Sequence, residues 1–253
     1  FSASPFFEFT REFMNFEPEA YSLRWYRQMV GISSVGDTTV VTNKWMLGTR
    51  NSFFIGVIAT LLATLLGTVA ALGLSRPHMP FKAVLMAILI SPMIVPLIIT
   101  AAGMFFFYSK IGLTHTYLGL ILAHTALGTP FVVITVTATL TGFDTNLIRA
   151  SQSLGADTLR TFFKVIMPLI LPGVISGGLF AFITSFDEVV VVMFVGSVEQ
   201  ITIPKQMWAG LRQETSPVIL CMATCLVALS IALLTTVEML RRRSERLRGI
   251  KQR

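Results

Sequence analysis

The chain has 253 residues, of which 53% are hydrophobic and only 13% charged, with a mean hydropathy of +0.73. Soluble domains carry about 25% charged residues, so this composition excludes an ordinary water-soluble domain. The net charge is +7, but basic charge alone is a non-specific sign of nucleic-acid binding. Because this charge is concentrated beside apolar windows, we expect no nucleic-acid partner.

The first 50 residues are rich in aromatic and charged side chains, as in "FFEFTREFMNFEPEAYSLRWYRQM". Aromatic residues are typical of membrane interfaces, and residues 1–50 are therefore predicted to form an extracytoplasmic arm. An arm of this polarity needs an upstream segment to carry it across the membrane. We expect a further transmembrane helix before Phe1, with a cleaved signal peptide as the alternative.

Residues 51–240 contain five long apolar windows, and about 20 apolar residues are enough to cross the ~30 Å hydrocarbon core as a helix. The windows are residues 52–75, 83–108, 116–141, 169–196 and 217–240. We therefore predict an all-α, polytopic membrane protein with these five spans, in addition to the expected N-terminal one.

The basic residues indicate the orientation of the chain. Segments 75–82, 142–169 and 240–253 hold 12 of the 20 Lys and Arg residues and only three acids. The segments on the opposite side hold 8 basic and 7 acidic residues. Since cationic loops stay in the cytoplasm, the C-terminus is predicted to be cytoplasmic. The basic tail, residues 241–253, is expected to anchor on anionic membrane lipid.

Two prolines, Pro92 and Pro96, interrupt the second window. Each removes a backbone N–H, which is tolerated at membrane depth only where the backbone is buried in protein or faces a wet cavity. Both a kinked helix that lines a transport pathway and a static kink remain open. Small residues recur every four positions in the first window, and glycines do so in the fourth, which predicts close helix packing; they are Ala59, Ala63, Gly67, Ala71, Gly173 and Gly177.

Asp187 and Glu188 are the only acids inside a window rather than near its end. An intramembrane carboxylate indicates a functional site by default, here a substrate pathway. The alternative is that the span has already ended, with Asp187 as a helix cap and the run "VVVVMFVG" as a non-helical return. His124 is interpreted as an interhelical hydrogen-bond donor. The cysteine pair in the last window is too small a set for a closed zinc site, so no metal site is expected.

The polar stretch "LIRASQSLGADTLRTFFKVIMPLILPG", residues 147–173, separates two apolar windows. It predicts two short helices, 144–153 and 156–166, broken at Gly155, with Asp157 as the N-cap of the second. Their apolar face comprises Leu147, Leu154, Leu159, Phe162, Phe163 and Ile166. Two helices at a fixed angle make a rigid cytoplasmic projection that could transmit force to a docked partner. A hairpin lying on lipid is the alternative.

This stretch resembles the coupling loop, or EAA loop, of type I ABC importer permeases, whose pattern is E-A-A, three residues, Gly, nine residues, I-x-L-P. The correspondence implies a coupling loop at 142–168 that contacts an ATPase through Arg149, Ala150, Ser151, Gly155, Ala156, Asp157 and Pro168. Two residues depart from the pattern. Arg149 stands where the pattern has Glu, and Ser151 stands where it has its second Ala.

The resemblance extends over nearly the whole chain. The stretches "SPMIVPLII", "TPFVVITVTATLTGFD" and "SFDEVVVVMFVG" are similar to the spermidine/putrescine branch of these permeases. It implies a type I ABC importer transmembrane domain in the bacterial inner membrane. The implied partners are a second permease subunit in a heterodimer, two ATPase subunits and an extracytoplasmic solute-binding protein. ATP and Mg²⁺ would bind the ATPases, and this chain, which contains no G-x-x-x-x-G-K-[ST] loop, would need no cofactor.

Two other functional classes fit the sequence less well. A membrane-embedded enzyme would need a nucleophile–base pair or a metal, whereas the three histidines are scattered and there is no G-x-S-x-G motif. An exporter is disfavoured by the resemblance. Carboxylates on a pathway favour a cationic, polyamine- or opine-like solute; another solute, such as an amino compound or a phosphonate, is the alternative.

Overall fold

The computed structural model describes residues 7–8, 20–21, 24–30, 39–76, 78–141, 144, 146–213 and 218–247. Nearly all of these are helical, apart from loops and the two-residue antiparallel strands β1 (Phe7–Glu8) and β2 (Ala20–Tyr21). The all-α prediction is therefore confirmed. The chain forms two compact units, Phe1–Met46 with Met207–Arg253 and Leu47–Gln206, which are described separately.

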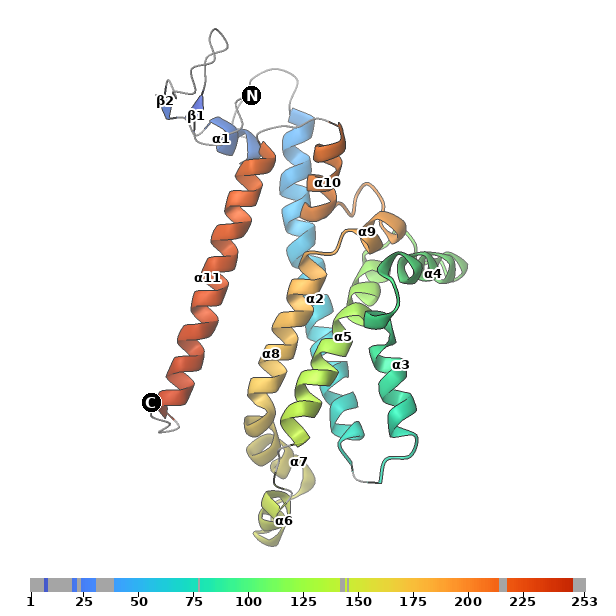
Figure 1. The fold of residues 1–253 in the computed structure, drawn as a ribbon, viewed down its shortest axis with the longest axis vertical. Helices are drawn as coiled ribbons and strands as arrows, with labels where there is room; N and C mark the ends of the chain where they lie inside the picture. Colours follow the sequence, from blue (N-terminus) through green and yellow to red (C-terminus); the bar gives the residue numbers. More distant parts are fainter. Residues whose placement is uncertain are drawn as a thin grey trace. The chain divides into compact units, whose positions relative to one another are not determined.

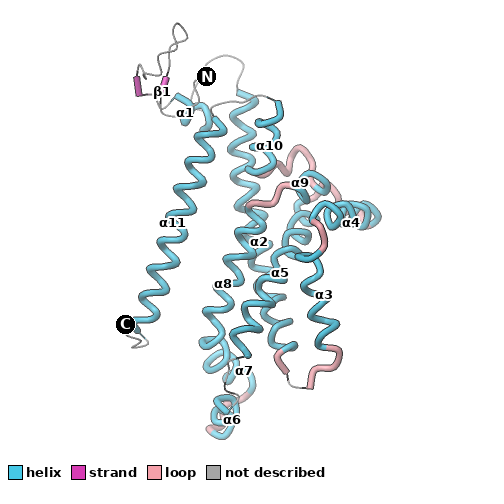
Figure 2. The backbone as a smooth tube through the Cα atoms, in the orientation of Figure 1, coloured by secondary structure: helices cyan, strands magenta, loops and turns pink. Residues whose placement is uncertain are grey.

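Figure 1 colours the helices in chain order, and Figure 2 distinguishes them from the loops and strands. They are α1 (Arg24–Val30), α2 (Thr39–Leu74), α3 (Lys82–Ile94), α4 (Leu97–Lys110), α5 (Tyr117–Thr141), α6 (Asn146–Ser153), α7 (Thr158–Thr161), the π-helical turn η1 (Phe162–Ile166), α8 (Met167–Phe186), α9 (Val190–Val195), α10 (Ile203–Gln213) and α11 (Val218–Leu247).

In the first unit, α1 packs against α11. Residues 39–50 of the predicted arm belong to α2. At the other end, α11 continues to Leu247 and so includes the first part of the predicted basic tail. Arg and Glu are good helix formers, so the helix extends into the charged segment. Most of the predicted arm and the last six residues lie outside the described residues.

In the second unit, α5 and α8 lie side by side along most of their length (Figure 1). Close packing explains the glycines. A Cβ at Gly177 would lie 2.8 Å from Val132 Cα, and a Cβ at Gly67 would lie 2.6 Å from Val132 Cβ. Ala63 is fully buried at the same junction. The small-residue pattern thus correctly predicted where α2, α5 and α8 approach one another.

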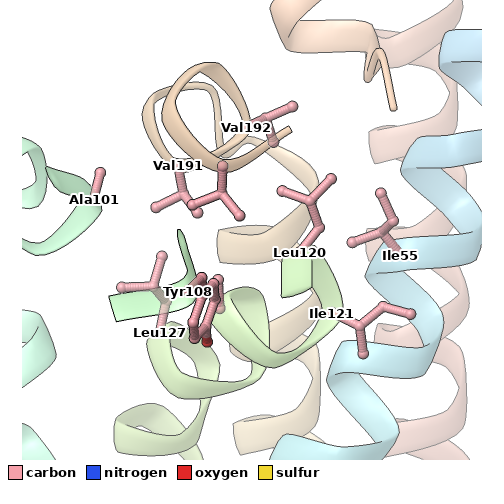
Figure 3. Packing of buried hydrophobic residues seen from close by; sticks show 10 residues of the cluster. Ile55, Ala101, Tyr108, Leu120, Ile121, Leu127, Val191 and Val192 are labelled. Atoms are coloured by element: carbon pink, nitrogen blue, oxygen red, sulfur yellow. The ribbon is translucent and has the colours of Figure 1, made fainter. Parts of the chain in front are cut away.

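A second core cluster joins α9 to α4, α5 and α2 (Figure 3). Val191 and Val192 of α9 lie on one side of Leu120 of α5, and Ile55 of α2 lies on the other side. All four side chains are buried. This apolar contact holds the short helix α9 against the longer helices.

Among the described residues, three helical stretches are long and apolar enough to cross a membrane: Lys44–Leu74, Tyr117–Thr141 and Thr158–Phe186. The window 83–108 is not one straight span, because α3 and α4 meet at an angle of 104°. Val95 is extended and Pro96 precedes α4, so the break lies at the second proline. The pair counts as a fourth span if taken together, and Val218–Ala232 is a shorter apolar helix.

The window 169–196 also differs from the expected single span. Its helix, α8, ends at Phe186, and the valine-rich run that follows forms α9 rather than a non-helical return. Burial of three valines and a carboxylate cap, described below, outweigh the low helix propensity of β-branched residues.

Candidate functional site

Residues 146–166 form a folded projection, which we call the elbow. Its first helix, α6, begins just after Asp144, whose Oδ1 accepts a hydrogen bond from Asn146 N at 2.9 Å. After α6 the chain turns at Gly155, whose N–H donates to the Gln152 carbonyl at 2.9 Å. Gly155 has a φ of +81°, and a Cβ there would have nothing within 4 Å. The left-handed backbone, and not lack of space, therefore favours glycine.

The second half of the elbow is capped as expected. Asp157 Oδ1 accepts a hydrogen bond from Arg160 N at 2.8 Å, and Asp157 has extended backbone angles. This is the geometry of a helix N-cap. The break at Gly155 and the Asp157 cap are confirmed, but the predicted second helix, 156–166, is not a separate short helix, because α7 continues through η1 into α8.

Between α7 and α8 the helix widens into a π turn, η1. There the N–H of Met167 donates to the carbonyl of Phe162, five residues earlier. Pro168 follows directly, in the first turn of α8. A proline lacks the N–H of a regular helix, and its ring presses on the carbonyl four residues before it, here that of Lys164. We attribute the wider turn to this crowding.

Apolar and basic side chains are exposed on the elbow. Leu154 is 89% exposed, Leu159 is 68% exposed and Phe163 is 62% exposed. Arg149 is exposed as well. Ile166 differs from the predicted apolar face, because it packs against the core of α2, α5 and α8. Exposed large apolar groups rimmed by polar ones are typical of a protein contact surface.

The structure brings most residues of the predicted coupling motif into the elbow. Arg149, Ala150 and Ser151 lie on α6, Gly155 and Ala156 form the turn, and Asp157 caps α7. Pro168 lies beyond η1 in α8.

At the other end of α8 lies what we call the corner, residues 187–189. Asp187 is exposed and ends α8, with its N–H donating to Ile183 O at 3.0 Å. Glu188 is only 6% exposed, and its Oε1 accepts a hydrogen bond from Val191 N at 2.8 Å. The two adjacent carboxylates therefore differ. Asp187 faces outward, whereas Glu188 caps α9.

A cavity of about 370 Å³ adjoins the corner. It is lined by Leu97, Ile183, Thr184, Asp187, Glu188, Val189 and Val190. Leu97 is the first residue of α4 and follows Pro96 directly, so the broken helix contributes one wall. Neither Pro92, which lies inside α3, nor Pro96 is among the lining residues.

His124 of α5 contacts the C-terminal end of α8. Its side chain is 1% exposed, and its Nδ1 lies 2.8 Å from Ser185 Oγ. Ser185 is two residues before Asp187. A Cβ at Gly56 of α2 would lie 3.8 Å from the same hydroxyl, so α2, α5 and α8 meet there. The interhelical contact predicted for His124 is present, but only one ring nitrogen takes part, because the buried Nε2 has no partner among the described residues.

The loop after α9, residues 196–202, is fastened to α2 and α5 by buried polar groups. Asn51 Nδ2 donates to the carbonyls of Glu199 (2.8 Å) and Ile201 (2.9 Å). Tyr117 Oη lies 3.1 Å from Asn51 Oδ1 and 3.2 Å from Glu199 O. Ser52 Oγ accepts from the backbone N–H of the first residue of α10 at 2.9 Å.

Lys205 of α10 also fastens this loop, by bonding to the end of α9 and to the start of the loop. Its Nζ donates to the carbonyls of Val192 and Ser197, both at 3.2 Å. A lysine at the C-terminal end of a helix satisfies its last carbonyls. Burial lowers the pKa of the Lys205 ammonium below its usual range. α9 is thus capped at both ends, by Glu188 and by Lys205.

Within the part of the chain that the structure describes, no three His, Cys, Asp or Glu side chains are grouped as metal ligands would be. The two cysteines of α11 are free thiols.

Comparison with known proteins identifies the fold and the family. Residues 63–246 match the family described as "Binding-protein-dependent transport system inner membrane component". The chain belongs to this family. It is a multi-pass inner-membrane transport component, which favours transport over the membrane-embedded enzyme.

Individual relatives agree with this assignment. The chain is 28% identical over 226 residues to the Haemophilus influenzae "Spermidine/putrescine transport system permease protein PotC", covering 89% of this chain and 84% of the relative. It is 27% identical over 220 residues to the "Putrescine transport system permease protein PotI" of Escherichia coli strain K12, covering 82% and 73%.

Solved structures support the fold. One neighbour is a bacterial ABC transporter involved in the import of the acidic polysaccharide alginate, with a TM-score of 0.66 and 16% identity, covering 87% of this chain and 80% of that one. Another is an amino acid ABC transporter, with a TM-score of 0.62 and 16% identity, covering 83% and 100%. The type I importer transmembrane fold expected from the resemblance is therefore confirmed.

Sequence reasoning missed the network around the 196–202 loop. Asn51 and Ser52 are a polar pair at the start of an apolar window, and this pair was the one sequence feature that could have pointed to the network. Their partners lie about 150 residues further along the chain, and nothing in the sequence indicates that pairing.

Proposed function

We propose that this permease subunit moves a small cationic solute, of the polyamine or opine type, across the inner membrane. The solute would come from an extracytoplasmic binding protein. A second, non-identical permease subunit would complete the pathway, and two separate ATPase subunits would bind ATP and Mg²⁺. This chain would need no cofactor, and its C-terminus would be cytoplasmic, as the positive-inside rule predicts.

The observation that carries the solute class is the exposed carboxylate of Asp187 beside the cavity. A fixed negative charge at the edge of a low-dielectric region attracts a cation more strongly than it would in water. A charge at membrane depth that faces lipid costs several kcal/mol, so Asp187, at the end of α8, is proposed to face a wet cavity completed by the second permease subunit. The names of the relatives, spermidine/putrescine and putrescine permeases, support the same class.

The elbow supports the proposed link to the ATPases. It is a projection of two capped helices with exposed leucines at its tip, and its residues match the spacing of the coupling motif. Arg149 reverses the charge that the motif carries at that position. We therefore propose that the groove of the cognate ATPase carries an acidic side chain at this point, because a carboxylate pairs well with the Arg149 guanidinium.

The test is solute uptake into proteoliposomes by the complete complex carrying Asp187→Asn. Asparagine keeps the size and hydrogen-bonding reach but removes the charge. We expect uptake of a polyamine to fall roughly tenfold, equivalent to about 1.4 kcal/mol in the barrier. Glu199→Gln is the matched control, because Glu199 is an exposed carboxylate away from the cavity whose described contacts use its backbone.

The same assay separates the solute classes. An anionic phosphonate would be repelled by Asp187, so the asparagine variant would transport it as well as or better than the wild type. Unchanged polyamine uptake at equal complex yield would reduce Asp187 to a helix cap and remove the argument for a cationic solute.

A further inference from the structure

Ser151 and Thr161 form a hydroxyl pair that joins the two halves of the elbow. Ser151 Oγ lies 2.9 Å from Thr161 Oγ1 and 2.8 Å from the carbonyl of Ile148. A serine hydroxyl has one proton, which the carbonyl takes because it can only accept. Thr161 is then the donor to Ser151. The bonds run from α7 through Ser151 to the backbone of α6.

The surroundings of this pair are unusual for the elbow. Most elbow side chains are exposed, whereas Thr161 is 2% exposed. The chain between α6 and α7 is a short turn at Gly155, and a Cβ at that glycine would have open space around it. The hydroxyl pair is thus a side-chain bond across the inside of the bend, where it can set the angle between the two helices.

Ser151 is also one of the two departures from the coupling motif, which has alanine there. An alanine cannot accept the Thr161 hydrogen bond. We propose that Ser151 and Thr161 form a latch that fixes the angle of the elbow, and that this latch positions the elbow for coupling to ATP hydrolysis. The inference rests on the proposed function, because it assigns the latch to the ATPase-facing segment.

The matched variants follow from the geometry. Ser151→Ala removes the acceptor and restores the motif residue, and Thr161→Val removes the donor while keeping the shape. Ser153→Ala is the control, since the hydrogen bond of Ser153 Oγ among the described residues lies within its own helix, to Arg149 O at 3.0 Å. Ser151→Thr keeps the hydroxyl and is the conservative rescue.

The first measurement is the ratio of ATP hydrolysis with and without solute-loaded binding protein, in the reconstituted complex. We expect each latch variant to lower this ratio about fivefold, the lower end of typical coupling energies, and the double variant to lower it no further. Ser153→Ala and Ser151→Thr should match the wild type. A wild-type ratio in Ser151→Ala would overturn the role of the latch in coupling.

The second measurement uses the permease chain without relying on ATP hydrolysis. Spin labels at Gln152 and Lys164, both exposed, report the distance between α6 and the helix after the bend, in a background lacking Cys221 and Cys225. Ser151→Ala should broaden the distance distribution, and Ser153→Ala should not. An unbroadened distribution would overturn the latch itself. If the wild-type complex showed no stimulation, the proposed function would fail, while the distance measurement would still decide the latch.

Discussion

At the scale of single residues, the two neighbouring acids of the corner differ in role because their surroundings differ. Glu188 is buried, and its carboxylate replaces a missing acceptor for the first turn of α9. Asp187 has no such backbone partner for its side chain among the described contacts, and it is exposed beside the cavity. Two neighbouring carboxylate residues therefore have different roles: Glu188 is structural, and Asp187 is accessible.

The buried hydrogen bond between His124 and Ser185 should be measurable by a double-mutant cycle. His124→Phe and Ser185→Ala each remove one partner, and each should destabilise the complex by about 1 kcal/mol, the usual worth of such a bond. The double variant should be little worse than either single variant, because the interaction can be lost only once. Thermal unfolding of the purified complex measures all four proteins.

Ser91→Ala is the control for this cycle, because its hydroxyl bonds only to Ile88 O within its own helix. Strict additivity of the two losses would show that the 2.8 Å contact contributes nothing to holding α8 against α5.

At the scale of helices, local sequence signals predicted most of what was found. The glycine with positive φ, the Asp157 cap and the small residues of α2 and α8 each reflect a local rule, and each proved correct. The bounds of α8 did not follow from local rules. The window stayed apolar to residue 196, but Glu188 folds back to cap α9. Lys205, from a different helix, bonds its last turn. Contacts made by distant residues ended one helix and began another.

The glycine contact between α5 and α8 gives a second prediction. Gly177→Ala would place a methyl group 2.8 Å from Val132 Cα, in a backbone contact that cannot rotate away. Overpacking of this kind costs about 1–3 kcal/mol, so the yield and thermal stability of the complex should fall.

Gly103→Ala is the matched control, because a Cβ there would have nothing within 4 Å. In an exposed helix position, this change should stabilise slightly through the higher helix propensity of alanine. Equal effects of the two substitutions on thermal unfolding would mean that α5 and α8 do not pack as closely as the structure has them.

At the scale of the whole second unit, one helical stretch links the elbow to the corner. From Thr158 to Phe186 the chain is helical for 29 residues, about 43 Å at 1.5 Å per residue. The elbow lies at one end and Asp187 at the other (Figure 1). A rotation of the elbow can therefore reach the cavity through a single continuous element. The π turn is the one irregular point in this stretch, and it sets how the elbow is rotated relative to α8.

The last prediction concerns that rotation. Pro168→Ala restores a backbone N–H and removes the ring that crowds the Lys164 carbonyl, so η1 should revert to a regular α-helix. A π turn holds one residue more than an α turn, and its loss should rotate the elbow by about 100° relative to α8. The substitution favours helix and should not impair folding. Nevertheless, we expect it to lower uptake and the stimulation of ATP hydrolysis about tenfold.

Pro172→Ala is the control, because Pro172 is an exposed proline of α8 outside the π turn. If both Pro168→Ala and Pro172→Ala coupled normally, the π turn would not be needed to transmit force from the elbow.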